Sequence, residues 1–340
     1  MAAKELKAIA ESIVADHKGV LAADESTGTI KKRFDSIGVD STEESRRAYR
    51  NLLFTTPGFE EYVGGVIMYD ETLRQASDDG TPFGDLLASK GVVPGIKVDT
   101  GAQDLAGHPG EKVTEGLDGL RARFEEYHAL GARFSKWRAV ITIGDGIPTD
   151  ACIHTNAHAL ARYAALSQEA GIVPIVEPEV LMDADNTIER CYEVTARTLH
   201  VVFYELNRQE VALEGMLLKP NMVISGKQCA TQAPSSQIAE LTVDCFLRHV
   251  PAIVPGIVFL SGGQSEVEAT ENLNSINRVG GPWPLSFSYG RALQASALEA
   301  WRGDSENVEA GQEAFLHRAR MNALAVAGNW SADVEEAVPA

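Results

Sequence analysis

The sequence predicts a single (β/α)8 TIM barrel. Eight short runs of β-branched and other apolar residues recur along the 340-residue chain, and a helical pattern follows each run. Several runs are nearly continuous in apolar residues, as parallel strands are when helices cover their outer face. Because eightfold strand–helix alternation is typical of such a barrel, we expect one domain over residues 1–340, with the barrel at about 18–301.

The predicted strands are short and are separated by segments long enough for a helix. They are VLAAD (20–24), VGGVIMY (63–69), VPGIKVD (93–99), ARFSKWRAVI (132–141), IVPIVEPEV (172–180), GMLLKPNMV (215–223), GIVFLSG (256–262) and LSFSYG (285–290). An extra helix is expected before the first strand, and a C-terminal helical extension and tail over 302–340.

Helix boundaries follow from capping and stop signals. Ser41 and Glu44 have the spacing of a capping box, which predicts a helix start there. Asn186 is expected to cap a long helix with apolar positions three and four apart. Gly171 is expected to end the helix that contains residues 157–164.

Composition excludes several classes of protein. The chain carries a net charge of −18, which disfavours nucleic acid and anionic membranes as partners. No apolar stretch approaches the roughly 18 residues that a membrane span needs, and the N-terminal segment lacks the apolar core of a signal peptide. Four cysteines without paired spacing indicate reduced thiols. We therefore expect a cytoplasmic protein.

The segment GMLLKPNMV places Lys219 inside an otherwise apolar run. Burial favours the neutral form of an amine and lowers its pKa from about 10.4. A neutral amine attacks carbonyl groups, and Schiff-base enzymes use a lysine in this way. The alternative is a strand-end lysine whose ammonium group reaches solvent.

Polar residues, Lys219 among them, stand at the ends of the predicted strands, where a barrel gathers them at one mouth. They are Asp24, Lys97, Lys136, Arg138, Glu177, Glu179, Lys219, Ser261, Ser288 and Arg291. A single charge at a strand end is usually solvated. Contributions from nearly every strand indicate an active site instead.

Two glycine-containing segments follow the last two strands, SGGQ (261–264) and SYGRAL (288–293). Loops at these places commonly bind phosphate, because glycines let backbone N–H groups approach an anion and arginine binds it bidentately. The alternative is a pair of ordinary turns. On the opposite side of the mouth, TGTIKKRF (27–34) supplies a basic triplet that predicts a second phosphate site, or else a solvated basic turn.

Glu177 lies in the apolar run IVEPEV, and its surroundings suit general acid–base work. The alternative is a structural ion pair with Lys136. His154 and His158 stand four apart, but no third ligand and no HExxH motif accompanies them, so no metal site is expected. The sequence also lacks a P-loop, a dinucleotide fingerprint and a GxSxG elbow.

Seven motifs stand in one order: ADESTGTI, GIKVD, FSKWR, IVPIVEPE, LLKPNMV, FLSGGQSE and SYGRALQASAL. Together they closely resemble the class I fructose-1,6-bisphosphate aldolases, from about Lys18 to Trp301. The resemblance implies a metal-independent, cofactor-free Schiff-base lyase of glycolysis and gluconeogenesis. It would reversibly cleave fructose 1,6-bisphosphate to dihydroxyacetone phosphate and glyceraldehyde 3-phosphate. It also implies a homotetramer.

The resemblance also implies a role for each matching residue. Lys219 is the Schiff-base lysine and Glu177 the principal acid–base residue, with Asp24 and Lys136 assisting at the reacting carbons, and Lys97 and Arg138 lining the site. By the same resemblance, the 1-phosphate is bound by Ser261, Gly262, Gly263, Ser288, Gly290 and Arg291, and the 6-phosphate is bound by Lys32 and Arg33.

The chain departs from the family at its end, where many members carry a tyrosine that helps to protonate an enamine. No tyrosine follows Tyr289, and the tail SADVEEAVPA is small and acidic. Its composition predicts a mobile, dispensable segment, which leaves enamine protonation to Glu177.

Three alternatives remain open. A Schiff-base barrel aldolase for another phosphosugar would not need the basic cluster at 31–33 if its substrate carried one phosphate. A zinc-dependent aldolase would need ligand spacing that the eight histidines lack. A non-catalytic scaffold of the same fold predicts loss of Lys219 or Glu177, and the sequence keeps both.

Overall fold

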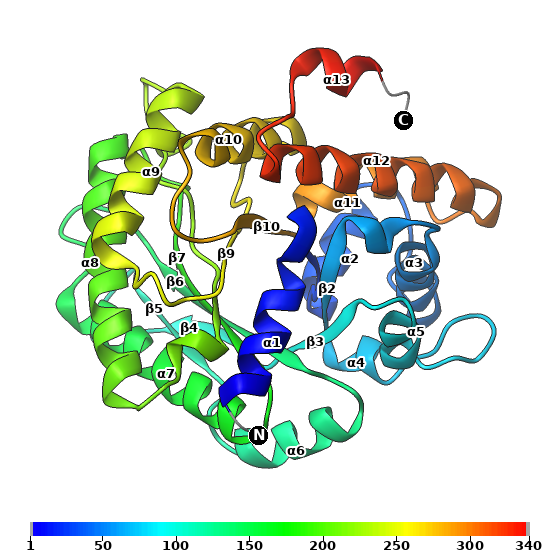
Figure 1. Cartoon of the computed structure of the whole chain (residues 1–340), viewed down its shortest axis with the longest axis horizontal. Coiled ribbons are helices and arrows are strands. Elements are labelled where there is room, and N and C mark those ends of the chain that lie inside the picture. Colours follow the sequence, from blue (N-terminus) through cyan, green and yellow to red (C-terminus); the bar gives the residue numbers. More distant parts are fainter. Residues whose placement is uncertain (1–2, 338–340) are drawn as a thin grey trace.

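Eight parallel strands close into a barrel in the order β1-β10-β9-β8-β7-β6-β3-β2, which confirms the predicted fold (Figure 1). The computed structural model describes residues 3–337. The barrel strands are β1 (Gly19–Ala23), β2 (Val63–Met68), β3 (Val93–Lys97), β6 (Phe134–Ile141), β7 (Val173–Val180), β8 (Leu217–Leu218), β9 (Ile257–Phe259) and β10 (Leu285–Tyr289). Each lies within one of the eight runs or extends it by a single residue.

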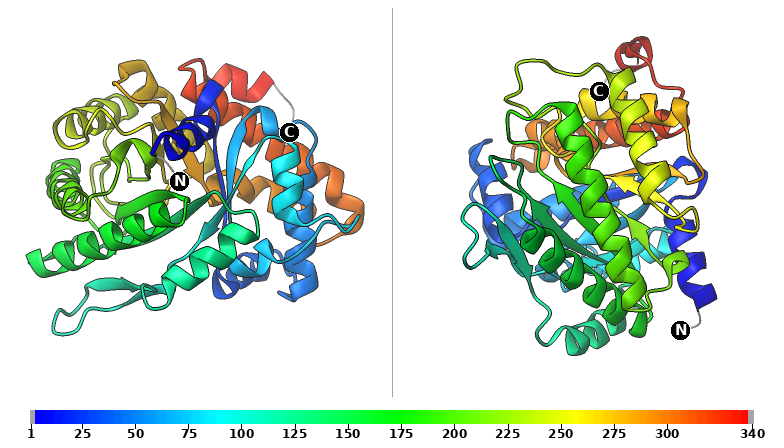
Figure 2. Two further views of the ribbon diagram at one scale, coloured as in Figure 1. Left: turned by 60° about the horizontal axis from the view of Figure 1, so that its bottom comes forward. Right: turned by 90° about the vertical axis from the view of Figure 1, so that its left-hand side faces the viewer.

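Helices surround the strands, as the two further views in Figure 2 show. They are α1 (Ala3–Ile13), α2 (Thr27–Asp35), α3 (Glu43–Thr55), α4 (Asp70–Leu73), α5 (Phe83–Ser89), α6 (Leu120–Ala129), α7 (Asp150–Glu169), α8 (Ile188–Arg208), α9 (Ser235–His249), α10 (Glu266–Val279), α11 (Arg291–Trp301), α12 (Val308–Val326) and α13 (Ala332–Ala337). Among the described residues, no helix combines the length and apolarity that crossing a membrane requires.

Helix α1 closes the N-terminal end of the barrel, and it crosses that end in Figure 1. Its buried residues Leu6 and Ile13 join a small core inside the barrel, together with Phe134 of β6. The strands must be glycine where this core is tightest, because a Cβ on Gly95 would lie 2.3 Å from the Phe134 ring. The packed N-terminal end leaves the C-terminal end of the strands for a site.

Two predicted helix caps are wrong by one residue. Helix α3 is capped by Thr42, whose hydroxyl accepts from the backbone N–H of Ser45, while the Ser45 hydroxyl accepts from the Thr42 N–H. Helix α8 is capped by Thr187, and the Asn186 amide donates instead to the Thr187 carbonyl. In both places a threonine with extended backbone stands directly before the first helical residue, which is the geometry of a cap.

A two-stranded antiparallel sheet interrupts the alternation between β3 and β6, and the sequence did not predict it. Its strands are β4 (Gly101–Asp104) and β5 (Lys112–Glu115). Their residues are mostly polar and partly exposed, so they carry little of the apolar signal by which barrel strands are found.

The tail after Trp330 was predicted to be mobile, but the structure shows a helix over 332–337; residues 338–340 lie outside the described range. Helix α13 lies beyond α12 at the edge of the molecule (Figure 1), and its Glu335 is ion-paired with the buried Arg318. The Trp330 indole donates to Glu335 over 2.7 Å. Burial would raise the pKa of Glu335, but the Trp330 hydrogen bond and the Arg318 charge outweigh it and lower the pKa.

Candidate active site

A cavity of about 880 Å³ opens at the C-terminal ends of the barrel strands. Every predicted site residue lines it except Gly263, which directly follows the lining residues Ser261 and Gly262. The lining set is Asp24, Lys32, Arg33, Lys97, Lys136, Arg138, Glu177, Lys219, Ser261, Gly262, Ser288, Gly290 and Arg291. Residues scattered over most of the chain therefore converge on one cavity.

Strand alternation and register explain this convergence. In β6, Phe134 faces the inside of the barrel, so Lys136 and Arg138 point the same way, further towards the mouth. The register pairs Lys97 with Lys136 and Arg138 with Glu177 across neighbouring strands. Lys97 and Lys136 thus form the first layer above the apolar core that fills the barrel, and Arg138 and Glu177 form the next.

Lys136 is surrounded by carboxylates. Its Nζ lies 2.8 Å from Asp24 Oδ2, 3.5 Å from Glu177 Oε2 and 3.7 Å from Asp99 Oδ2. Burial would lower the pKa of Lys136, but the charges of Asp24, Glu177 and Asp99 outweigh it and raise the pKa above its usual value. Lys136 is therefore a permanent cation near neutral pH.

Asp24 is the counterpart of this cation. Burial would raise its pKa, but the ammonium groups of Lys136 and Lys219 hold the pKa of Asp24 well below its usual range. The carboxylate stays ionised at any physiological pH. It can accept hydrogen bonds or balance charge, but it does not act as an acid there.

Lys219 follows directly after β8, and its side chain is 5% exposed. Its Nζ lies 3.3 Å from Glu177 Oε1, within reach of a proton transfer. The other oxygen, Glu177 Oε2, is buried and has no hydrogen-bond partner among the described residues. Lys97 differs, because its ammonium contacts both the carboxylate and the carbonyl of Asp99 at 2.7 Å. Of the three lysines, Lys219 is the one placed as a nucleophile beside a base.

The loops after β9 and β10 form an anion-binding corner. Gly262 has a φ of 57°, which suits a turn of converging backbone N–H groups. Arg291, the first residue of α11, donates to the Gly262 carbonyl over 3.3 Å. The buried Ser288 Oγ has no hydrogen-bond partner within residues 3–337. A phosphate oxygen would satisfy it.

Arg33 lies beside this corner, so its expected place on the opposite side of the mouth is wrong. In the closed barrel β1 pairs with β10, which brings the segment after β1 next to the loop after β10. A Cβ on Gly290 would lie 3.5 Å from Arg33 Nη2. The buried Glu25 holds Arg33 by an ion pair and contacts Arg50 over 2.5 Å.

Sequence reasoning missed several residues of the cavity. Asp99 ends a predicted strand, so the strand-end rule could have included it. Glu25 adjoins Asp24, but only the fold reveals its arginine partners. Arg123 stands on α6 and donates to the Val98 carbonyl over 2.9 Å. No strand-end signal could have found it.

The mouth is positive although the chain is acidic. Eight basic and six acidic side chains line the cavity, an excess of two positive charges, whereas the whole chain carries −18. A local excess of cations against the overall field favours a phosphorylated substrate.

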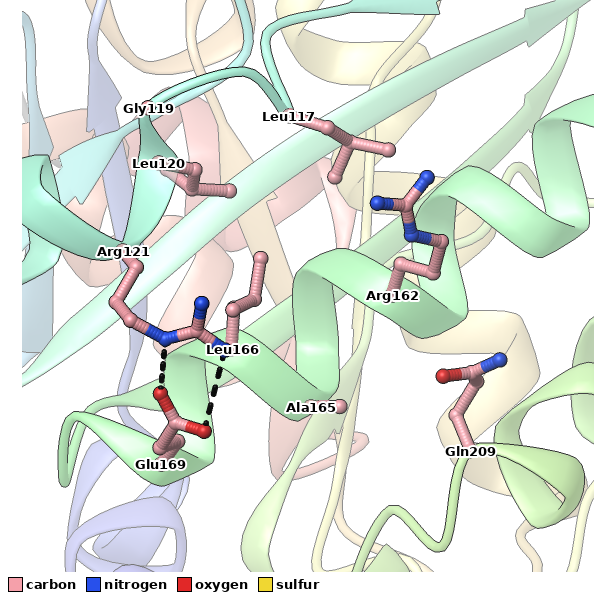
Figure 3. A pocket seen from close by; sticks show the side chains of 9 residues that line it. All are labelled: Leu117, Gly119, Leu120, Arg121, Arg162, Ala165, Leu166, Glu169 and Gln209. Atoms are coloured by element: carbon pink, nitrogen blue, oxygen red, sulfur yellow. Dashed lines mark hydrogen bonds and ion pairs between the residues drawn. The ribbon is translucent and has the colours of Figure 1, made fainter.

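A second hollow of about 400 Å³ lies on the outer helices (Figure 3). It is lined by Leu117 and Leu120 together with Arg162, and Arg121 is bonded to Glu169 at its edge. No predicted site residue lines it, and it lacks the buried polar side chains of the barrel mouth. We therefore place the chemistry in the mouth.

His154 and His158, which stand four residues apart, have different hydrogen-bond partners. The ring of His154 contacts the Asp150 carbonyl at 2.9 Å, and that of His158 contacts Glu205 at 3.0 Å. Within residues 3–337, no group of three histidine, cysteine or acidic side chains could hold a metal ion.

A buried lysine beside a buried carboxylate, next to an anion-binding corner at a barrel mouth, is typical of Schiff-base lyases that act on phosphorylated carbonyl compounds. The family model of class I fructose-bisphosphate aldolases matches residues 5–339. This chain is 57% identical over 332 residues to a probable fructose-bisphosphate aldolase class 1 of Xanthomonas campestris pv. campestris, covering 97% of this chain and 99% of the relative.

An Arabidopsis thaliana relative, fructose-bisphosphate aldolase 6, cytosolic, is 55% identical over 335 residues, or 98% of this chain and 93% of its own. A solved fructose-bisphosphate aldolase from Plasmodium falciparum, in complex with TRAP and a small-molecule inhibitor, superposes with a TM-score of 0.95. It is 50% identical, and the match covers 97% of this chain and 96% of that one. The chain therefore belongs to the class I fructose-bisphosphate aldolase family, whose members are lyases.

Proposed function

We propose that this chain reversibly cleaves fructose 1,6-bisphosphate to dihydroxyacetone phosphate and glyceraldehyde 3-phosphate through a Schiff base on Lys219, without metal or cofactor. One observation carries the proposal: Lys219 Nζ lies 3.3 Å from Glu177 within a positive barrel mouth. The family supplies the reaction, and the geometry supports the assignment of roles.

The first half of the reaction forms the covalent intermediate. Lys219 gives a proton to Glu177, and its free amine then attacks the substrate ketone to give a carbinolamine. Glu177, 3.3 Å from the amine, takes and returns the protons. Loss of water then leaves an iminium cation that is joined to Lys219. The permanent cation Lys136 stands 3.5 Å from Glu177 and stabilises the carboxylate between these transfers.

The second half breaks the carbon–carbon bond. A base removes the proton of the 4-hydroxyl group, and the bond between carbons three and four cleaves. The electron pair of that bond flows into the iminium and gives an enamine, while glyceraldehyde 3-phosphate leaves. Protonation of carbon three and hydrolysis then release dihydroxyacetone phosphate and restore Lys219. We assign both proton transfers to Glu177, with Asp24 and Lys136 fixing the hydroxyl groups.

The phosphates set the direction of the substrate in the cavity. Ser261, Gly262, Ser288, Gly290 and Arg291 are suited to the 1-phosphate, because they form the anion-binding corner. Arg33 joins this group in our proposal, since it lies beside Gly290 rather than across the mouth. Lys32, Lys97 and Arg138 remain for the 6-phosphate.

Three further properties are carried by resemblance or by relatives. We propose a homotetramer, which light scattering on the purified chain tests directly. A cytoplasmic location agrees with the names of the Arabidopsis thaliana relatives, which are called cytosolic. We also propose that barrel and C-terminal extension unfold as one domain, since α12 and α13 are bonded to α10 through Arg318. A single calorimetric transition is expected.

The test is an assay of purified protein with fructose 1,6-bisphosphate, which should yield both triose phosphates in equal amounts. Activity should survive prolonged chelation. Loss of activity with the chelator and recovery with zinc would contradict the Schiff-base mechanism and indicate a zinc-dependent aldolase. Cleavage of a monophosphorylated sugar in preference to the bisphosphate would favour another aldolase, and no cleavage at all would favour the scaffold.

A further inference from the structure

Lys227 packs against the loop that carries Ser261, Gly262 and Gly263. A Cβ on Gly263 would lie only 1.7 Å from both Cε and Nζ of Lys227, so the end of that side chain fills the space beside the glycine backbone. Ser261 and Gly262 line the cavity, whereas Lys227 does not. The loop thus contacts both the substrate cavity, through Ser261 and Gly262, and Lys227, through Gly263.

Two residues of the loop after β7 complete this contact. Asp183 Oδ1 lies 3.0 Å from Lys227 Nζ, and the backbone N–H of Lys227 donates to the Met182 carbonyl over 2.8 Å. The Gly263 N–H donates to Met182 Sδ over 2.7 Å. The acceptor of this N–H is a thioether sulfur, which is weaker than an oxygen acceptor.

The ion pair of Lys227 is also weak. The side chains of Lys227 and Asp183 are 40% and 67% exposed, and pairs of this kind contribute little to stability. The ammonium is therefore only partly neutralised by Asp183, and it lies against Gly263, the residue after Gly262 of the cavity lining. In a chain of charge −18, a cation placed there favours a dianion in the corner.

We propose that Lys227 is a positioning residue of the 1-phosphate subsite. It packs against Gly263 and adds positive charge to the anion-binding corner, and the carboxylate of Asp183 partly cancels that charge. The inference rests on the proposed function only in taking the corner to bind the phosphate of the substrate. It assigns to Lys227 an effect on phosphate affinity and none on the bond-breaking steps.

The test compares Lys227→Gln with Asp183→Asn. Inorganic phosphate is titrated into each protein and followed by 31P NMR, which needs no turnover and so remains informative even if the protein cleaves no fructose 1,6-bisphosphate. Lys227→Gln should weaken phosphate binding about three- to tenfold, which is the effect expected when a half-exposed positive charge near a dianion is removed. Asp183→Asn should tighten phosphate binding, because it removes the opposing charge. Lys227→Arg keeps the positive charge and should bind phosphate as the wild type does.

Lys7→Gln is the matched control, because Lys7 is a similarly exposed lysine paired with Glu11 on α1, at the other end of the barrel. It should leave phosphate affinity unchanged. In cleavage assays Lys227→Gln should raise KM for fructose 1,6-bisphosphate and leave kcat within twofold. Equal shifts in Lys227→Gln and Lys7→Gln, or a fall in kcat with unchanged phosphate affinity, would overturn the proposal.

Discussion

Replacing Glu177 by glutamine should abolish most turnover while leaving the fold and substrate binding intact. Glu177 is 3% exposed and contacts Lys219 at 3.3 Å and Lys136 at 3.5 Å. Glutamine keeps its size, and Lys136 still has Asp24 at 2.8 Å and Asp99 at 3.7 Å. The substitution therefore removes a proton acceptor and leaves the neighbouring cation paired.

The expected size of the effect follows from the role. General acid–base catalysis contributes about 10²- to 10⁴-fold, which is about 2.7–5.4 kcal/mol on the activation barrier. Glu177 Oε1 is the carboxylate oxygen at the Lys219 amine. Asp24 is a poor replacement, because Lys136 and Lys219 hold its pKa well below its usual range and make it a weak base. We expect kcat to fall at least a hundredfold, with KM changed by less than about threefold.

Steady-state cleavage measures kcat and KM, and rapid-quench trapping with borohydride measures the rate of Schiff-base formation. The matched control is Glu179→Gln, the same change two residues along β7, where the carboxylate pairs with Arg138. It should raise KM more than it lowers kcat. A Glu177→Gln variant that keeps kcat within tenfold of the wild type would refute the assignment of Glu177.

Three more outcomes are expected. Arg33→Ala should weaken the use of fructose 1-phosphate as well as fructose 1,6-bisphosphate, by about 10- to 150-fold in kcat/KM for a lost charged contact; an effect confined to the bisphosphate would return Arg33 to the 6-phosphate. Glu335→Gln should lower the free energy of unfolding by about 1–3 kcal/mol at pH 7 in urea, since it removes the carboxylate that is ion-paired with the buried Arg318. Folding lowers the pKa of Glu335, so its contribution to stability is complete above the pKa of the unfolded state and is lost as pH falls through the pKa of the folded state. Below about pH 4.5 the wild type should therefore lose stability more steeply than the variant. Parallel curves of unfolding free energy against pH would contradict this.

The barrel and most of its mouth could be predicted from the sequence because both follow from local rules. Apolar runs of the right length mark the strands, and the chain direction fixes which ends meet. Lys97, Lys136 and Glu177 therefore had to share a mouth once eight parallel strands were predicted. The anion corner likewise followed from glycines and an arginine placed after the last two strands.

Two things could not be predicted from the sequence: which strands are neighbours around the barrel, and which residues far apart in the chain form ion pairs. Arg33 was expected across the mouth because the first and last strands are far apart in the chain, yet closure of the barrel makes them neighbours. The acidic tail was expected to be mobile because nothing local reveals that Glu335 meets a buried Arg318. Arg123 lines the cavity from a helix, and Lys227 contacts Gly263 from a long loop; no periodic pattern identifies either residue.

The most direct test of the central claim is to identify the amine that becomes covalently bound to substrate. Purified protein is mixed with dihydroxyacetone phosphate, reduced with borohydride, digested and sequenced by mass spectrometry. We predict one stable adduct, on the peptide that contains Lys219, and none in Lys219→Met. An adduct on Lys136 or Lys97, or the absence of any adduct from a protein that cleaves fructose 1,6-bisphosphate, would contradict the account.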